Sequence, residues 1–322
     1  MPLRKETTVH HQRDLKLKEK VKKAKEHRKQ RKLRKESGAP VGIPQTLETL
    51  RTYDETTIVE TDPDLIAEEQ VVSFNTANFP YHSLQDEVAD IFRNERTPKL
   101  LLTFSDRVCP RTIGFCKELT KIIPNMRIAP RWHLPLKKII PKAIEHGFTA
   151  LLVVNEDQKK VNTLVVSHLP EGPTVTFRLS NVRLRREMRG RRRPKDIEPD
   201  VVPHLITSRF TTRLGRRTER LIAALFPDRS RSTPEGHSRT IVFHNQRDFI
   251  FFRHFRYQQR TSHANEKNKE PGKSYVAMNE VGPRFTLKLR SIQQGTFDSQ
   301  FGDYEWVRKR SEVGRNRRTF VM

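Results

Sequence analysis

The stretch from residue 203 to residue 227 carries the residues best suited to binding chemistry, because five arginines accompany an apolar helical face there. Guanidinium groups bind phosphate through paired hydrogen bonds, and the free amides at a helix N-terminus favour anions. The stretch therefore predicts a phosphate-binding helix start. The alternative is an ordinary amphipathic helix with a solvated basic face. The five arginines are Arg209, Arg213, Arg216, Arg217 and Arg220.

The elements that must position these arginines are also visible in the sequence. A short strand is predicted over 205–208, and Thr211 or Thr212 can cap the helix that follows, since a short side-chain oxygen accepts from first-turn amides. After Gly215, apolar residues recur at helical spacing up to the stop at Pro227. That apolar face would fix the helix on a core. The apolar residues are Leu221, Ile222, Leu225 and Phe226.

A second basic cluster occupies residues 183–193. So many arginines in so short a segment exceed what solubility requires, so phosphate contact is favoured over a solvated linker. The cluster consists of Arg183, Arg185, Arg186, Arg189, Arg191, Arg192 and Arg193.

Aromatic and basic residues alternate between Phe251 and Tyr257. Such mixing can stack bases, but aromatic residues spaced by two on a strand more often pack in a core. We therefore expect Arg253 and Arg256 to contact RNA and the phenylalanines to pack.

Residues that catalyse reactions are not gathered in any recognisable pattern. The 12 histidines are scattered, and Cys109 and Cys116 have no second cysteine pair, so neither a zinc site nor a disulfide framework is expected. The sequence has no glycine-rich phosphate loop and no carboxylate cluster of the kind that metal-dependent nucleases use. We expect no enzymatic activity, no metal and no cofactor.

The charge of the chain points to a polyanionic partner. It has 63 Lys and Arg against 38 Asp and Glu, a net charge of +25. Nucleic acid is the expected partner of such an excess. A membrane surface is the rival, but no apolar run approaches the roughly 20 residues that span a bilayer, and no signal peptide opens the sequence.

Composition divides the chain into four parts. Residues 1–43 form a basic arm with too little apolar surface to fold alone, which we expect to be disordered or helical on binding. Residues 44–97 read as an acidic linker that ends in a short anchoring helix, with its apolar residues between Phe79 and Phe92. The main domain is predicted over 98–295, and residues 296–322 form a basic C-terminal extension.

The main domain reads as a repeat. Strand, polar turn, helix and proline follow one another up to Pro124 and again up to Pro227, and Gly-Pro opens matching strands at Gly172 and Gly282. Alternating strands and helices predict an α/β structure of two similar halves, 98–190 and 200–295. The apolar runs at 151–154 and 250–252 predict strands covered on both faces.

These segments resemble the Brix-domain family of ribosome assembly factors. The resemblance runs from about residue 99 to the C-terminus and is carried by FTTRLGRRTERLIAALFP, FFRHFRYQ and EVGPRFTLKLRSIQQGTFD. TPKLLLTFSDRVCPRTIGFCKEL and GTFDSQFGDYEWVRKR are similar to one subgroup, the ribosome production factor one proteins. The resemblance implies a duplicated α/β Brix-type domain in a nuclear, nucleolar protein. It also implies binding to precursor ribosomal RNA, maturation of the large (60S) subunit, and no catalysis.

The resemblance further implies partners among the pre-60S assembly factors, including a small metal-binding nucleolar factor, and among ribosomal proteins. Two alternatives come from other classes. An RNA-processing enzyme subunit would need a carboxylate cluster or a cofactor loop. A DNA-binding regulator would place the arginine-rich helix in a major groove, but no compact helix-turn-helix surrounds that helix.

Overall fold

The computed structural model divides into two compact units, residues 1–51 and 52–322. It describes residues 45–53, 56–58, 87–188, 202–231, 239–261, 274–297, 302–309 and 318–322, together with scattered positions between 17 and 33. In the first unit, the described residues between Leu17 and Leu33 are helical, and Leu17 and Leu33 are exposed.

The second unit is built on one mixed sheet of eleven strands. The strands are β1 (Leu100–Phe104), β2 (Met126–Ile128), β3 (Ala150–Asp157), β4 (Lys160–His168), β5 (Thr174–Arg183), β6 (His204–Ser208), β7 (Arg239–Gln246), β8 (Phe249–Thr261), β9 (Ser274–Glu280), β10 (Arg284–Gln293) and β11 (Tyr304–Val307). The helices are α3 (Ala89–Phe92), α4 (Pro110–Ile122), α5 (Leu136–Glu145), the 3-10 turn η1 (Arg185–Glu187), α6 (Arg213–Ala223) and α7 (Asp228–Arg231). The chain is therefore an α/β protein, as the sequence predicts.

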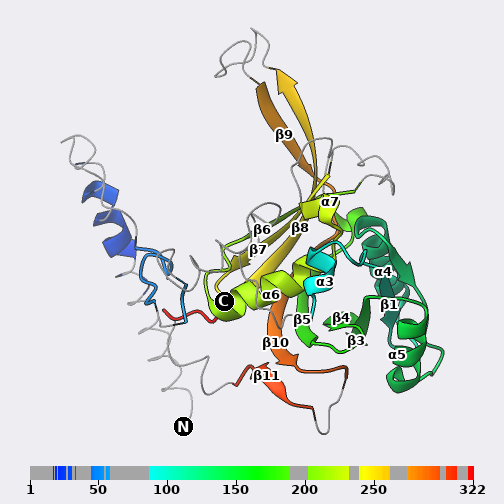
Figure 1. Ribbon diagram of the computed structural model, residues 1–322. Helices are drawn as coiled ribbons and strands as arrows, with labels where there is room; N and C mark the ends of the chain where they lie inside the picture. The colour runs from blue at the N-terminus through cyan, green and yellow to red at the C-terminus, as the bar shows by residue number, and fades with distance from the viewer. Residues whose placement is uncertain are drawn as a thin grey trace, which may run out of the picture. The chain divides into compact units, whose positions relative to one another are not determined.

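The strands follow the order β2-β1-β3-β4-β5-β10-β8-β7-β6, with β9 beside β8 and β11 beside β10 (Figure 1). β1 runs parallel to β3, and β3, β4 and β5 form an antiparallel series. β6 runs parallel to β7, and β7, β8 and β10 form a second antiparallel series. The two series meet where β5 pairs with β10. The order β1-β3-β4-β5 thus matches the order β6-β7-β8-β10, and β1 and β6 are each followed by a long helix, α4 or α6. Among the described strands, β2, β9 and β11 fall outside this match.

The two Gly-Pro pairs occupy corresponding places, directly before β5 and β10. Gly172 and Gly282 both have positive φ, at 109° and 80°. A Cβ on Gly172 would lie 2.7 Å from the backbone of Gly295, so glycine is needed there for close approach as well as for conformation. Whether the halves superimpose residue by residue stays a prediction.

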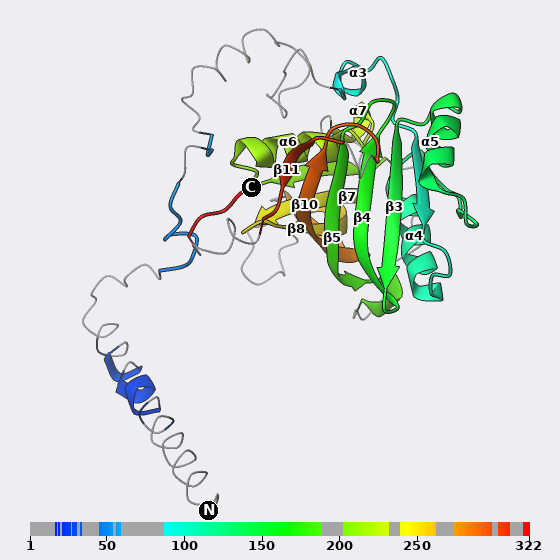
Figure 2. The ribbon, with the colours of Figure 1, turned by 90° about the horizontal axis from the view of Figure 1, so that it is seen from below.

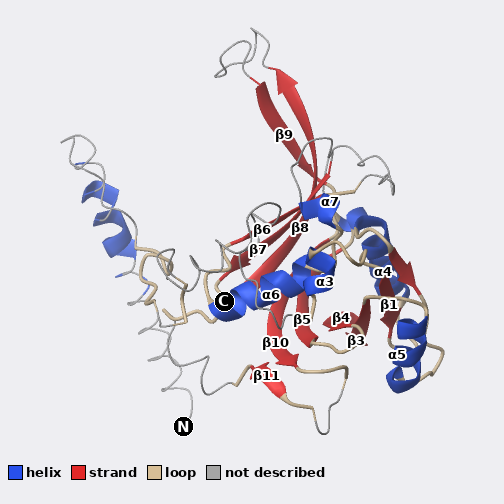
Figure 3. Ribbon diagram, in the orientation of Figure 1, coloured by secondary structure: helices blue, strands red, loops and turns tan. Residues whose placement is uncertain are grey.

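One face of the sheet is covered by α4 and α6, and we call it the helix-covered face. Its core joins Phe115 and Leu119 of α4 to Leu221 and Phe226 of the α6 segment, all at most 2% exposed. Phe252 and Phe285 stack in this core with ring centroids 4.2 Å apart. Figure 3 shows α3 and α6 lying along this side of the strands.

The opposite face is covered only at one end by the described helices. Leu151 and Val153 of β3 pack there against Ile140 and Ala143 of α5, while their neighbours Leu152 and Val154 join the first core. The run 151–154 is therefore buried on both faces, as predicted. The same prediction for 250–252 is wrong, because Phe251 is only half-buried. Across β5, β10 and β8 no described helix lies over this surface, and we call this part of it the open face (Figure 2).

The hairpin turns are shorter than the polar runs predict. The polar run 156–160 predicts a turn of five residues, but only Gln158 and Lys159 leave the strands, with φ of 47° and 60°. Arg247 and Asp248 do the same between β7 and β8, with φ of 53° and 63°. Two positive φ values match the strand twist in a two-residue hairpin, so the flanking polar residues extend the strands.

The anchoring segment before the domain is described only at its end. Val88, Ile91 and Phe92 are buried in the core, and α3 covers the last four residues of the predicted helix. Residues 79–86 lie outside the described residues. The predicted domain boundaries are otherwise untested, and they stay a proposal.

Candidate nucleic-acid interface

The start of α6 is fixed by a side-chain cap. Thr212 is the N-cap, and its Oγ1 accepts from the Gly215 amide at 3.0 Å, which confirms the capping prediction. The same hydroxyl donates to the Val321 carbonyl at 2.7 Å, and the Arg213 amide donates to the Thr56 carbonyl at 3.1 Å. The amides of Gly215 and Arg213, at the helix start predicted to bind phosphate, therefore donate to oxygens of the protein instead.

The last residues of the chain, Val321 and Met322, also pack against the start of α6. A Cβ on Gly215 would lie 3.2 Å from the backbone of Met322, which is 2% exposed. The amides of Val321 and Met322 both donate to Asp248 Oδ1, at 2.8 and 2.9 Å. The helix N-terminus is thus built into the core, and RNA would have to be contacted by arginine side chains around it.

Arg216 and Arg217 of α6 form ion pairs within the protein. Arg216 pairs with the buried Glu219 at 3.1 Å, and burial is the main cause that raises the pKa of this carboxyl. Arg217 pairs with Glu87 at 2.8 Å and with Glu305 at 3.4 Å. These contacts tie α6 to the segment before α3 and to β11.

The other arginines of this stretch divide by exposure. Arg220 is 4% exposed and lies over the ring of Phe92, with 4.0 Å from Cζ to the centroid. Its position assigns it to packing, so our proposed contact set omits it. Arg209 and Arg213 are exposed, and Arg209 has a φ of 64°. They are the two members of this group best placed to reach an RNA backbone.

The second predicted cluster is described only in its first half, because Arg189, Arg191, Arg192 and Arg193 lie outside the described residues. The turn that holds Arg185 and Arg186 is fixed by carboxylates. The Arg185 amide donates to Glu118 at 3.0 Å, and Arg111 donates to Glu187 at 2.8 Å. The hydrogen bond from Arg111 is the main cause that lowers the pKa of Glu187 to about 2. Arg183 and Arg186 are exposed beside this turn.

Arg253 and Arg256 lie on opposite faces of β8, since successive strand residues alternate. Arg253 is on the open face beside Arg284 and Arg183. Its pKa is lowered, first by burial and then by Arg284. Arg256 lies opposite Arg239 on the helix-covered side and is half-buried. The two predicted contacts therefore do not form one surface.

Two groups that could do catalysis, Cys116 and His254, are built into the core. Burial raises the pKa of the Cys116 thiol to about 12, which leaves it protonated and unreactive near neutral pH. His254 is 0% exposed, its Nδ1 is 2.9 Å from the Gly282 carbonyl, and burial lowers its pKa to about 4. Within the described ranges, no three His, Cys, Asp or Glu side chains are grouped to hold a metal ion.

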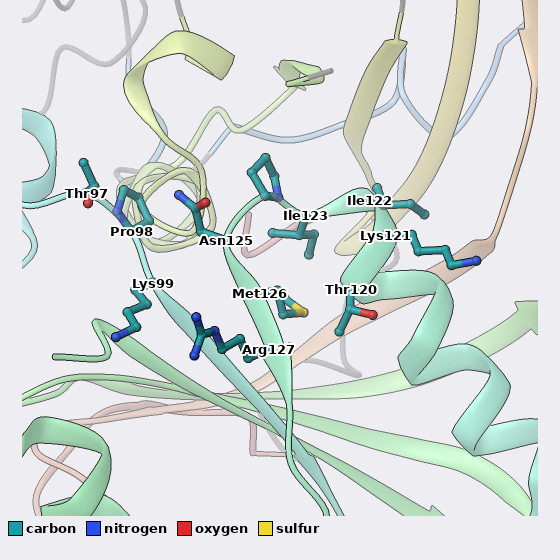
Figure 4. A pocket seen from close by; sticks show the side chains of 11 residues that line it. Thr97, Pro98, Lys99, Thr120, Lys121, Ile122, Ile123, Asn125, Met126 and Arg127 are labelled. Carbon is teal, nitrogen blue, oxygen red and sulfur yellow. The ribbon is translucent and has the colours of Figure 1, made fainter. Parts of the chain in front are cut away.

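A cavity of about 450 Å³ lies near the start of β1 and β2 (Figure 4). Lys99, Lys121 and Arg127 contribute its charge, and its lining has no acidic, histidine or cysteine side chain. It sits at the amino ends of these parallel strands, whereas ligands of open α/β sheets bind beyond the carboxyl ends. The cavity therefore offers charge but no catalytic group.

Among the described helices, none is long and apolar enough to cross a membrane.

The chain is similar to known proteins over most of its length. The Brix domain model matches residues 105–291. Ribosome production factor 1 of Pongo abelii is 44% identical over 304 residues, covering 94% of this chain and 78% of that protein. Ribosome production factor 1 of Danio rerio is 46% identical over 283 residues, covering 87% and 76%.

A solved structure from Aeropyrum pernix K1, of a "probable ribosomal biogenesis protein", covers 59% of this chain and 96% of its own, with 19% identity and a TM-score of 0.40. The family match spans more than half of the sequence, and the relatives align along nearly all of it. The chain therefore belongs to the Brix domain family.

Proposed function

We propose that this protein is a non-catalytic assembly factor that binds precursor ribosomal RNA during biogenesis of the large ribosomal subunit. The observation that carries the proposal is its 44% identity, over 94% of its length, to a relative named ribosome production factor 1. The net charge of +25 supports RNA as the bound polyanion. A nucleolar location follows from this function, because ribosomal precursors are made and assembled there.

The exposed arginines supply the proposed RNA contacts. Arg209 precedes α6 and Arg213 is its first residue, while Arg183 ends β5 and Arg186 lies within η1. Guanidinium groups at such positions neutralise phosphates without reading sequence, and contacts to base edges or to shape then select the site. The contacts from Arg189 to Arg193 stay a prediction from sequence.

The alternatives from other classes receive no support from the described residues. A DNA-reading helix would present one free face to the major groove. The start of α6 instead donates hydrogen bonds to the carbonyls of Val321 and Thr56, and Arg217 pairs with two carboxylates. We also propose that partners in preribosomes include other assembly factors and ribosomal proteins. A small metal-binding nucleolar factor is the partner that the family resemblance implies.

The proposal is tested by purifying the tagged full chain from cells and sequencing the RNA that accompanies it. We expect precursors of the large-subunit RNAs, and we expect these precursors to accumulate when the protein is depleted. Recovery of small-subunit precursors alone, or of no ribosomal RNA, would refute it. Mass spectrometry of the same preparation identifies the protein partners.

A further inference from the structure

Two phenylalanines on the open face lie outside the buried core. Phe249 and Phe251 are two residues apart on β8, so both side chains project from the same face. Phe251 lies opposite His244 on β7 and Thr286 on β10, which places it in the middle of the sheet. Phe249 is 37% exposed and Phe251 is half-buried. By contrast, their neighbours Ile250 and Phe252 are 0% exposed on the helix-covered face.

Cationic side chains lie against both rings. Lys288 Nζ is 4.3 Å from the ring centroid of Phe249, and Arg253 Cζ is 5.5 Å from that of Phe251. Arg178 lies directly opposite Lys288 on β5. Arg284 and Arg183 form the next pair along the same two strands.

The charge on this face is unbalanced. Glu280 pairs with Arg253 at 3.8 Å and also contacts Arg284. Within the part of the chain that the structure describes, Arg178 and Arg183 have no ion-pair partner. The pKa of Lys288 is lowered, first by burial and then by repulsion from Arg308, which itself pairs with Asp248 at 3.9 Å. A phosphate placed here would relieve that repulsion.

A purely structural role explains this arrangement less well. Rings that serve only packing are covered, as Phe252 and Phe285 are on the other face. The described helix on this side of the sheet, α5, packs against β3, outside the open face and away from β8. Two partly exposed rings among cations are instead the arrangement with which RNA-binding sheets stack two or three bases.

We propose that the open face binds single-stranded RNA, with bases stacked on Phe249 and Phe251 and phosphates held by Arg178, Lys288 and Arg253. This inference rests on the proposed function and deepens it by naming the class of RNA and the surface that binds it. Single strands are favoured because an aromatic ring needs an unpaired base face, which a duplex buries. Stacking tolerates any base, so sequence selectivity on this face is expected to be low.

The test measures binding of the full chain to a short oligouridylate across a range of salt concentrations. Phe249→Leu keeps an apolar side chain but removes the ring, and should weaken binding about fivefold or more without changing the salt slope. Arg178→Gln should weaken binding and lower the slope of log affinity against log salt by about 0.7. Arg127→Gln is the matched control, because this exposed arginine lies on β2 at the far end of the sheet. The affinity of Arg127→Gln for oligouridylate should be closer to that of the wild type than the affinity of Phe249→Leu or Arg178→Gln.

The outcomes separate this inference from the proposed function. If the wild-type chain binds RNA but Phe249→Leu binds equally well, and ultraviolet crosslinks avoid residues 249–253, the open-face site is refuted and the proposed function stands. If the wild-type chain binds no RNA at any salt concentration, both fail. If Phe249→Leu keeps its oligouridylate affinity but loses a protein from purified preribosomes, the face docks protein and the inference is overturned. Equal melting temperatures of wild type and variants exclude unfolding as the cause.

Discussion

The guanidinium of Arg220 lies 4.0 Å from the ring centroid of Phe92, and both side chains are at most 5% exposed. This contact joins the arginine-rich helix to the segment that precedes the sheet. A cation over an aromatic ring is worth about 2 kcal/mol when water is excluded. One of the five arginines in the 203–227 stretch is therefore part of the core.

Replacement of Arg220 by Ala should lower the free energy of unfolding by about 2 kcal/mol or more, because it also removes buried packing. Replacement of Arg213 by Ala is the matched control. Its side chain is exposed, so the change should stay within about 0.5 kcal/mol. Thermal or denaturant unfolding of the two variants measures the difference. Equal stabilities would show that Arg220 is not buried as described.

The pairing of Arg217 with Glu87 and Glu305 predicts a charge-swap effect. Arg217→Glu should destabilise the protein by about 2 kcal/mol, because it removes charged hydrogen bonds and places like charges together. Adding Glu87→Arg should recover part of that loss. A double-mutant cycle in denaturant measures the coupling between the two residues, and additive effects of the two changes would argue against the pair.

Glu187 predicts a specific dependence of stability on pH. Its pKa is lowered to about 2, mainly by the hydrogen bond from Arg111. A carboxyl with a lowered folded-state pKa stabilises the protein above its unfolded-state value of about 4.5, and this stability is lost as pH falls toward 2. Because both side chains are partly exposed, the effect should be roughly 1 kcal/mol.

The variant Glu187→Gln should reduce stability at neutral pH and flatten the loss between pH 4.5 and 2. Unfolding curves at a series of pH values measure this. The same acid slope in variant and wild type would contradict the assignment.

Two glycines test the close approach between the strand ends. Gly172→Ala should destabilise by about 2 kcal/mol or more, because its φ of 109° excludes a side chain and its Cβ would meet Gly295 at 2.7 Å. Gly114→Ala is the control, since Gly114 lies in α4 and its Cβ would sit 3.7 Å from Leu184. That variant should be neutral or more stable by up to about 1 kcal/mol. Comparable losses in both would refute the described geometry.

Local sequence signals predicted the elements better than their surroundings. The strand before α6, the Thr212 cap and the burial of Leu221 and Phe226 all follow from short-range patterns and are confirmed. The partners of Arg217 could not be predicted, because Glu87 lies 130 residues away in sequence. The predicted turn lengths were wrong, because the polar residues next to each two-residue turn belong to the strands.

The open face could not be identified from sequence for a related reason. The pattern around Phe251 was interpreted as packing, since periodicity does not tell which face of a strand is covered. That depends on α5 packing against β3 and on the pairing of β8 with β10, both of which are long-range. Arg253 and Arg256 lie on opposite faces because they are three residues apart on β8, where successive side chains alternate.

The central claim is that this chain contacts precursor RNA of the large ribosomal subunit directly. Ultraviolet crosslinking of the protein to RNA in cells, followed by sequencing of the attached fragments, tests it most directly. The account predicts crosslinks concentrated in large-subunit precursor sequences, with crosslinked peptides that contain Arg183, Arg213 or Phe249. Crosslinks no more frequent than those of an unrelated basic protein, or confined to other RNAs, would contradict it.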